Sequence, residues 1–251
     1  MMQIIFSLIL LTTILAPNFT SKNLDQKQAK ENKRIEIAEW KTYLTGRFDP
    51  ATHEDFVAVP KRYSLGPNMM YLRKETYDAF LKMREEAVKS GITLNLASAT
   101  RNFDYQKGIW ETKWLNTYAN TADPMERFEK ILEYSAAPGT SRHHFGTDID
   151  INGADPAYFE TEKGKKVYSW LSANAREFGF CQVYDSKGES RVSGYNEEKW
   201  HWSYLPLAKD WTSKYKDFIT DADIKGFLGD SEAPKLNLIQ NYVLSINPEC
   251  I

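Results

Sequence analysis

Two short strings of the sequence combine histidine with carboxylate side chains, a mixture of residue types that can hold a metal ion. The first string, SRHHFGTDID, ends at Asp150 and contains His143. The second string, EKWHW, begins at Glu198 and contains His201. The whole chain has four histidines, so most of its imidazole groups lie in these two strings.

The side chains in the strings match the needs of hydrolysis at a metal ion. A catalytic zinc ion takes three protein ligands, from imidazole nitrogens and carboxylate oxygens, and keeps a water in its fourth position. The ion lowers the pKa of that water to about 7. A further carboxylate accepts the water's proton and passes it to the leaving amine. His143, Asp150 and His201 suit the role of ligands, and Glu198 suits that of the base.

The spacing within each string predicts how these side chains are presented. Gly146 allows a sharp turn before a β-like segment, in which Asp148 and Asp150 would share one face. Glu198 and His201 are three residues apart, so they would face opposite ways on one regular strand. We therefore expect Glu198 in a turn that precedes the strand of His201.

Each string alone is weak evidence, because such short patterns occur by coincidence. His144 is not expected to bind the metal, since its side chain points away from that of its neighbour. His53 is expected to be a surface or capping residue. Trp200 and Trp202 fit core positions better than a substrate platform.

Taken together, the strings read SxHxxGxxxD followed about fifty residues later by ExxHW. This combination resembles the VanY-type D-alanyl-D-alanine carboxypeptidases. They belong to a zinc peptidase superfamily that includes D-Ala-D-Ala dipeptidases, some murein endopeptidases and the hedgehog signalling domain. The resemblance covers residues 55–206 and includes SATR at 98–101 and Gln106, which are similar to the family's SxxR…Q segment.

The resemblance implies a role for each residue of the motifs. His143, Asp150 and His201 would bind Zn²⁺, and Glu198 would be the catalytic base. Arg101 would supply a cation for the terminal carboxylate of the substrate or for the developing oxyanion, to which a planar guanidinium is suited. A structural ion pair is the alternative for Arg101.

Three further positions follow from the same resemblance. Gln106 and Ser141 would form hydrogen bonds with peptide groups of the substrate, with a structural capping role as the alternative. Asp148 departs from the family, which usually has a small residue there. This extra carboxylate would orient a ligand histidine, bind a substrate amine, or point outward.

The elements that position these residues follow from hydrophobic periodicity. Apolar residues at helical spacing predict helices over 76–90, 102–115, 124–134 and 162–178. Alternating or short apolar runs predict strands over 92–99, 147–151, 180–185 and 199–204. This order indicates an α+β fold with a small, mostly antiparallel sheet flanked by helices. By resemblance, the fold is of the hedgehog or D-Ala-D-Ala peptidase type.

The ends of the chain differ from its middle. Residues 4–16 form an apolar run that is short for a membrane span and suits a signal peptide. We expect a signal peptide at 1–22, a polar linker at 23–44, the zinc carboxypeptidase domain at 45–210 and a packed C-terminal extension at 211–251. An uncleaved membrane anchor is the alternative to the signal peptide. Residues 236–246 suit a helix or a strand.

Composition narrows the choice of partners. The net charge of −2 gives no electrostatic reason to expect nucleic acid as a partner. Cys181 and Cys250 are the only cysteines, and in an exported protein they permit a disulfide, with two buried thiols as the alternative.

The resulting prediction is a zinc-dependent enzyme that removes a terminal D-alanine from peptidoglycan stem peptides. It would act in the periplasm or cell envelope, with no membrane span left after signal cleavage. The alternatives are a murein endopeptidase or an LD-carboxypeptidase on the same site, and a non-catalytic wall-binding or signalling module.

Overall fold

The computed structural model describes residues 18–251. Most of the predicted signal peptide, including the apolar run at 4–16, lies outside the described residues. Within 18–251, no helix is both long enough and apolar enough to cross a membrane.

The chain divides into two compact units, residues 1–38 and 39–251. The described part of the first unit is helical and belongs to α1 (Asn18–Leu44), so most of the polar stretch predicted as a linker forms a helix. In the first unit, α1 has local side-chain contacts: Gln28 donates a hydrogen bond to Asn32, and Arg34 forms an ion pair with Glu31. The last turn of α1 belongs to the second unit.

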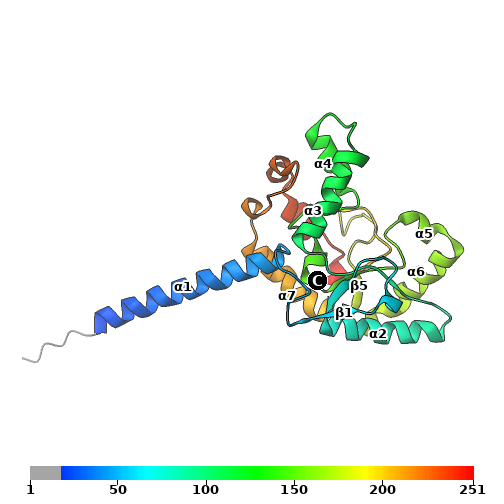
Figure 1. Cartoon of the computed structure of the whole chain (residues 1–251), viewed down its shortest axis with the longest axis horizontal. Helices are drawn as coiled ribbons and strands as arrows, with labels where there is room; N and C mark the ends of the chain where they lie inside the picture. The colour runs from blue at the N-terminus through cyan, green and yellow to red at the C-terminus, as the bar shows by residue number, and fades with distance from the viewer. Residues whose placement is uncertain (1–17) are drawn as a thin grey trace, which may run out of the picture. The chain divides into compact units, whose positions relative to one another are not determined.

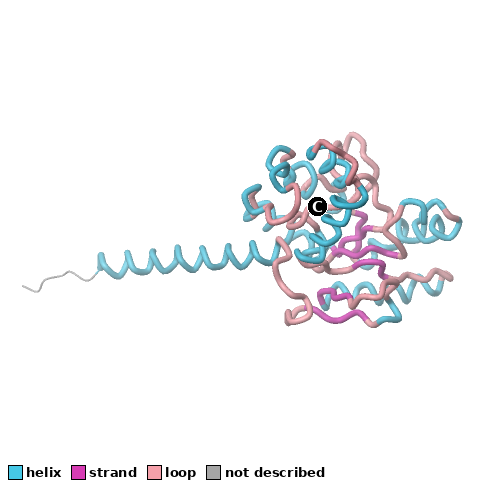
Figure 2. The backbone as a smooth tube through the Cα atoms, turned by 45° about the horizontal axis from the view of Figure 1, so that its top comes forward, coloured by secondary structure: helices cyan, strands magenta, loops and turns pink. Residues whose placement is uncertain are grey.

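The second unit contains a four-stranded antiparallel sheet, drawn in magenta in Figure 2. Its strand order is β3-β4-β6-β5, formed by β3 (Leu96–Ser98), β4 (Asp148–Ile151), β6 (His201–Tyr204) and β5 (Phe180–Gln182). Helices surround this sheet, and the predicted α+β fold class is thereby confirmed.

The helices begin and end close to the predicted positions. Side chains of Asn102 and Asp123 cap two of them by accepting backbone hydrogen bonds, as expected of N-cap residues. Gly179 ends another in the left-handed conformation. The helices of the second unit are α2 (Lys74–Lys89), α3 (Phe103–Thr112), α4 (Pro124–Leu132), α5 (Pro156–Glu160), α6 (Glu162–Asn174) and α7 (Leu205–Phe218).

The two faces of the sheet have different chemistry. Ile149, Ile151 and Trp202 point to one face, where they pack with apolar residues of α2 and α6. The opposite face carries polar side chains of β4 and β6. A second apolar cluster is built from α3, α4, α7 and the C-terminal residues. Figure 1 shows α4 and α2, which belong to different clusters, on opposite sides of the second unit. The polar face of the sheet is where the predicted site residues lie.

The strands are shorter than predicted, and for the two neighbours of the central strand β4 the reason is the length of β4 itself. Gly146 and Asn152 flank β4 with positive φ angles of 77° and 59°, which turn the chain out of the ladder at both ends. Neighbouring strands can pair only along the four residues between these turns. A separate two-stranded sheet of β1 (Phe56–Val59) and β2 (Met70–Arg73) was not predicted.

The C-terminal residues are joined to the rest of the second unit. α7 begins at Leu205 and continues past position 211, so a helix crosses the predicted boundary of the extension. The 236–246 stretch is helical, with a π-helical turn over Ile239–Val243. Cys250 forms a disulfide with Cys181 of β5, so the two cysteines are cross-linked and are not separate buried thiols.

Candidate metal centre and active site

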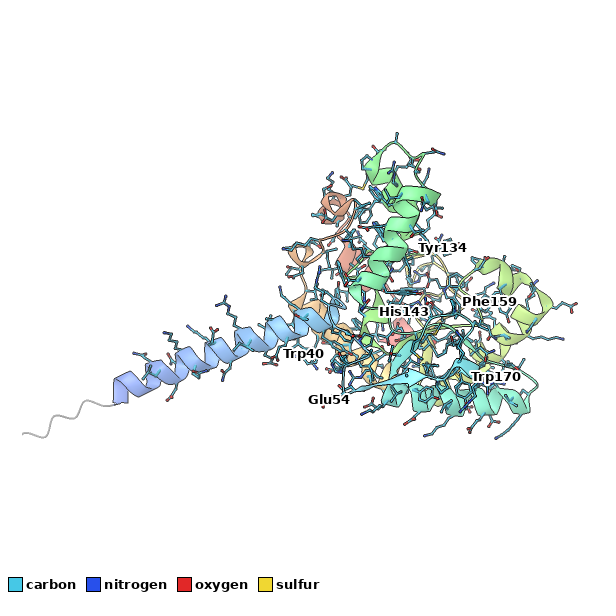
Figure 3. All side chains as sticks on the ribbon, viewed as in Figure 1. Trp40, Glu54, Tyr134, His143, Phe159 and Trp170 are labelled. Carbon is cyan, nitrogen blue, oxygen red and sulfur yellow. A yellow bond between two sulfur atoms is a disulfide. The ribbon has the colours of Figure 1, made fainter. Side chains whose placement is uncertain are left out.

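A cavity of about 220 Å³ opens beside the polar face of the sheet. Six of the seven predicted site residues line it: Arg101, Ser141, His143, Asp150, Glu198 and His201. Figure 3 shows His143 near the middle of the second unit, consistent with its burial. Residues from several separate parts of the sequence therefore meet at one cavity.

Pairing between β4 and β6 brings the two sequence strings together. The antiparallel register places Asp150 directly opposite His201 and Asp148 opposite Ser203. Directly opposed residues of an antiparallel pair lie close together on the same face of the sheet. The ladder therefore sets the distance between the second histidine and both aspartates.

His143 reaches the same point from a short 3₁₀ turn, Arg142–Phe145. The Ser141 side chain accepts a hydrogen bond from the His143 backbone at the start of this turn. Gly146 ends the turn in the left-handed region, where an added Cβ would lie 2.4 Å from the Phe56 ring. Only glycine allows the chain to pass directly from this turn into β4.

The imidazole of His143 has a defined tautomer. Its Nδ1 lies 2.8 Å from the carbonyl oxygen of Ala99, which can only accept, so Nδ1 carries the hydrogen. Burial, together with the charge of Arg101, lowers the pKa of His143 and favours its neutral form. The lone pair of Nε2 therefore points into the site.

Within the described residues, His143 Nε2 and Asp150 Oδ1 are buried without a hydrogen-bond partner. The two atoms face each other across 3.3 Å. Two buried acceptors in this arrangement need a shared cation. Ligand atoms of His143, Asp150 and His201 all lie within 4.8 Å of one another, so the three can hold a metal ion. Two imidazoles and one carboxylate suit zinc.

Glu198 lies in a turn before β6, as predicted. The turn is closed by a hydrogen bond from the His201 backbone to the Glu198 carbonyl. The Glu198 carboxylate lies 3.0 Å from His201 Nδ1. Burial raises the pKa of Glu198 above its ordinary value, although His201 opposes the shift. A raised pKa suits a carboxylate that must accept a proton and later release it.

The remaining histidines are engaged elsewhere. Nδ1 of His144 lies 2.6 Å from the Arg101 carbonyl, and Nε2 accepts a hydrogen bond from the Gly139 backbone. Both nitrogens are therefore occupied, and burial lowers the pKa of His144 to about 3. His53 accepts a hydrogen bond from the Asp55 backbone and packs among aromatic rings.

Arg101 and Gln106 are placed differently with respect to the cavity. Arg101 Nη1 lies 3.6 Å from Asp150 Oδ2 and donates to Ser98, so the guanidinium is held at the cavity wall. Gln106 is buried, and it is absent from the described residues that line the cavity. Its Nε2 donates to the carbonyl of Ala136, which does line the cavity.

Asp148 is buried beneath the site. It accepts hydrogen bonds from Arg142, His201, Thr147 and Ser203. Burial alone would raise the pKa of Asp148, but the Arg142 charge and the His201 hydrogen bond outweigh it and hold that pKa below its usual range. Burial would lower the pKa of His201, but hydrogen bonds from its ring to the carboxylates of Asp148 and Glu198 outweigh burial and raise that pKa to about 9.

Sequence reasoning missed several residues of the cavity wall, of which Lys113 and Arg142 are basic. Lys113 donates a hydrogen bond to Ser135, and burial lowers the pKa of its ammonium group. A signal for it existed, because Lys113 follows Gln106 by seven residues, or two helical turns. The other wall residues that were missed are Ile109, Tyr134, Ser135, Ala136, Ala154, Tyr184, Tyr195 and Trp200.

Comparison with known proteins gives the same relationship as the motifs. The profile of the VanY family, described as D-alanyl-D-alanine carboxypeptidase, matches residues 69–207. A Bacillus subtilis (strain 168) protein, YodJ, is 30% identical over 170 residues, covering 64% of this chain and 56% of its own. A D-alanyl-D-alanine carboxypeptidase of Enterococcus faecalis is 30% identical over 123 residues, which cover 49% of this chain and 44% of the Enterococcus protein. The chain spans about half the length of these curated relatives.

Two solved structures overlap with the chain in part. A vancomycin-resistance D,D-pentapeptidase VanY from a VanB-type cassette, in complex with Zn(II), has a TM-score of 0.48 and 23% identity, covering 70% of this chain and 93% of its own. The LD-carboxypeptidase LdcB has a TM-score of 0.49 and 24% identity, and the match covers 76% of this chain and 80% of the LdcB chain. The profile match extends over more than half of the chain and includes both histidine–carboxylate strings. The chain belongs to the VanY D-alanyl-D-alanine carboxypeptidase family.

Proposed function

We propose that the protein is a zinc-dependent carboxypeptidase that removes a terminal D-alanine from peptidoglycan stem peptides. The observation that carries the proposal is the pair of unpartnered buried acceptors, His143 Nε2 and Asp150 Oδ1, beside His201 and Glu198 at one cavity. The substrate class rests on membership of the VanY family.

His143, Asp150 and His201 would hold the zinc ion. A zinc ion held there would polarise the scissile carbonyl and lower the pKa of a water molecule, so that the water can lose a proton and attack the carbonyl carbon. Glu198 accepts the proton of that water on its carboxylate and delivers it to the nitrogen of the leaving D-alanine. The burial of Glu198 supports this role, because it raises the pKa of the carboxyl above its usual value and makes the carboxylate a stronger base.

The charge of the cavity wall supports a substrate with a free carboxylate. Arg101 and Lys113 both line the cavity and contribute cationic groups to it. Arg101 can bind a carboxylate or a developing oxyanion through two parallel N–H groups. Lys113 can reach the same anion as a point charge. A terminal D-amino acid presents such a carboxylate next to the scissile bond.

We also propose that the protein is exported to the periplasm or cell envelope. The apolar run at 4–16 supports a signal peptide. The proposed substrate supports the same location, because stem peptides of the wall lie outside the cytoplasm. The disulfide is consistent with an oxidising compartment.

Mass spectrometry of muropeptides incubated with the purified protein tests the proposal. Pentapeptides, tetrapeptides and cross-linked dimers are supplied separately, and we expect loss of one D-alanine from the pentapeptide. Glu198→Gln should keep its zinc and lose this activity. Glu197→Gln is the matched control, because this neighbouring carboxylate is absent from the described residues of the cavity wall.

Each other outcome has a clear meaning. Equal activity of Glu198→Gln and wild type would show that Glu198 is not the base. Full activity of a zinc-free protein in chelator would overturn the metal scheme. Release of D-alanine from the tetrapeptide alone would assign an LD-carboxypeptidase, and cleavage of dimers alone would assign an endopeptidase.

A further inference from the structure

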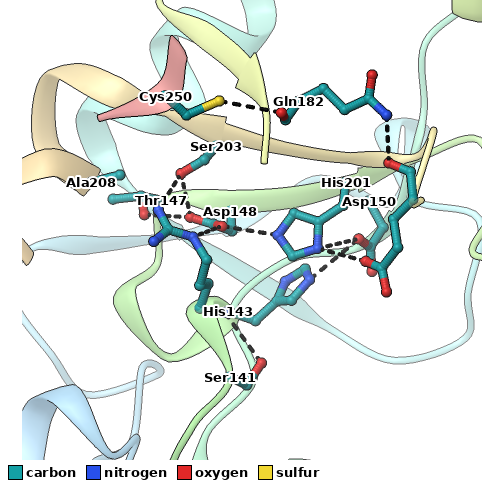
Figure 4. A network of polar contacts seen from close by, with 12 residues as sticks. Ser141, His143, Thr147, Asp148, Asp150, Gln182, His201, Ser203, Ala208 and Cys250 are labelled. Atoms are coloured by element: carbon teal, nitrogen blue, oxygen red, sulfur yellow. Dashed lines mark hydrogen bonds and ion pairs between the residues drawn. The ribbon is translucent and has the colours of Figure 1, made fainter. Parts of the chain in front are cut away.

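One buried carboxylate beside the metal centre has no part in the proposed reaction. Asp148 is 0% exposed, and it is not among the described residues that line the cavity. Its Oδ1 accepts hydrogen bonds from Thr147 Oγ1 at 2.8 Å and Ser203 Oγ at 2.7 Å. Its Oδ2 lies 3.0 Å from Arg142 Nε and 2.9 Å from His201 Nε2 (Figure 4).

These contacts limit what Asp148 can do. An ionised carboxylate has about four acceptor sites, and four donors already surround Asp148. The group therefore has neither the exposure nor a remaining acceptor site to bind a substrate amine or act as a base. Of the three possibilities raised by its sequence position, only orientation of a ligand histidine agrees with the geometry.

The charge of Asp148 is balanced by a buried cation, Arg142. Arg142 is 1% exposed, and its remaining donors bond to Thr212 at 2.8 Å and Ser203 at 3.0 Å. Thr212 belongs to α7, so the C-terminal helix also contributes to this arrangement. All three guanidinium nitrogens of Arg142 donate hydrogen bonds, and such a network holds a buried ion pair in one geometry.

The consequence for His201 concerns which nitrogen faces the metal site. Because ionised Asp148 can only accept, Nε2 of His201 carries a hydrogen, and in the neutral ring that binds a metal the lone pair lies on Nδ1. Nδ1 lies on the side of the ring that faces the two other carboxylates of the site, at 3.0 Å from Glu198 Oε2 and 3.8 Å from Asp150 Oδ1. His143 is set in the opposite sense, since the Ala99 carbonyl holds Nδ1–H and leaves Nε2 free.

We propose that Asp148, held by Arg142, is a positioning residue that directs Nδ1 of His201 to the metal and raises its basicity. A carboxylate on the remote nitrogen of a ligand histidine orients the ring and increases metal affinity. The inference rests on the proposed metal centre, but not on the identity of the substrate. It also gives a physical role to the one motif position at which this chain departs from the relatives that it resembles.

Zinc affinity, measured by competition with a chromogenic chelator, tests the inference without any substrate. We expect Asp148→Asn and Asp148→Ala to bind zinc about 10- to 100-fold more weakly than the wild type. Asn retains an acceptor for His201 Nε2 but lacks the charge, so its loss should be the smaller of the two. Because Ala leaves Arg142 buried without its partner, the double variant Asp148→Ala/Arg142→Leu is measured as well, with thermal unfolding as the check on folding.

Asp55→Asn is the matched control, since it removes the carboxylate from another ion pair with a buried guanidinium, Arg73. It should bind zinc as tightly as the wild type. Nitrogen NMR of the histidine side chains gives a second readout: zinc-loaded wild type should keep its hydrogen on Nε2 of His201. A folded Asn variant and a folded double variant, both with wild-type zinc affinity, would overturn the inference while leaving the proposed function intact. A wild type that binds zinc without cleaving muropeptides would overturn only the function.

Discussion

At the scale of single residues, the centre depends on which atom of each side chain is free. His143 and His201 present different nitrogens, because a backbone carbonyl holds one ring and a buried carboxylate faces the other. Asp150 contributes an oxygen that has no partner among the described residues. Small changes at these atoms should therefore have large effects on metal binding.

Replacement of a proposed ligand should remove the metal. We expect His143→Gln to lose bound zinc and carboxypeptidase activity together, because the Gln side chain does not supply an imidazole lone pair. Elemental analysis of the dialysed protein measures the zinc content. His53→Gln is the control, since His53 packs among aromatic rings away from the cavity wall, and it should keep its zinc. Retention of stoichiometric zinc by His143→Gln would exclude His143 as a ligand.

Loss of the cation at Lys113 should weaken substrate binding more than turnover. A hydrogen bond to a charged group contributes about 1.5–3 kcal/mol, so Lys113→Met should raise KM on the order of tenfold to a hundredfold. Steady-state kinetics on a stem peptide measures the change. Lys107→Met serves as the control, because Lys107 pairs with Glu111 on the same helix and should leave KM unaltered. A substrate amidated at its C-terminus should show little difference between Lys113→Met and wild type.

At the scale of elements, the register between β4 and β6 brings the side chains of the candidate metal centre together. Asp148 and Asp150 face the cavity side of the sheet only because Ile149 and Ile151 face the opposite apolar cluster. A shift of one residue would exchange these faces. The left-handed turn at Gly146 starts β4 in the correct register, so this turn is the part of the fold most sensitive to a small substitution.

We expect Gly146→Ala to destabilise the protein by more than the 1–2 kcal/mol or so that a left-handed conformation costs an L-residue. The added Cβ would lie 2.4 Å from the Phe56 ring, which must move. Urea unfolding measures the change. Gly188→Ala is a matched control, because a Cβ there meets no atom within 4 Å among the described residues, and it should change stability by less than about 0.5 kcal/mol. Equal midpoints for the two variants would contradict this view of the turn.

At the scale of the whole second unit, the C-terminal residues complete one of its two apolar clusters. Tyr215, Phe227 and Val243 are buried with residues of α3 and α4, and the disulfide joins Cys250 to the edge strand β5. The extension therefore belongs to the same packed core as the cavity wall.

Removal of the disulfide should lower stability without removing the fold. Cys181 and Cys250 are 69 residues apart, and a cross-link over such a loop contributes about 2–4 kcal/mol. We expect Cys250→Ser to lower the free energy of unfolding by this amount in urea titrations. Reductant should lower the free energy of unfolding of the wild type to that of the variant, and it should leave the value of the variant unchanged. A variant as stable as oxidised wild type would show that the cross-link adds nothing.

The sequence by itself determined the family of the protein and the order of most elements around the candidate site. Metal-binding residue types stand at characteristic spacings around Gly146, and capping residues such as Asn102 and Gly179 act through bonds to near neighbours. These are local features, so they can be predicted from a single chain. The family relationship follows from the same local motifs.

Only the tertiary structure decided which atoms meet. Strand register, ring orientation and burial depend on contacts between residues far apart in the chain. The tautomer of His201 depends on Asp148, 53 positions away. Asp148 pairs with Arg142, and Arg142 donates a hydrogen bond to Thr212, which lies on a helix beyond the motifs. For the same reason, the buried place of Gln106 outside the cavity wall could not be read from the sequence.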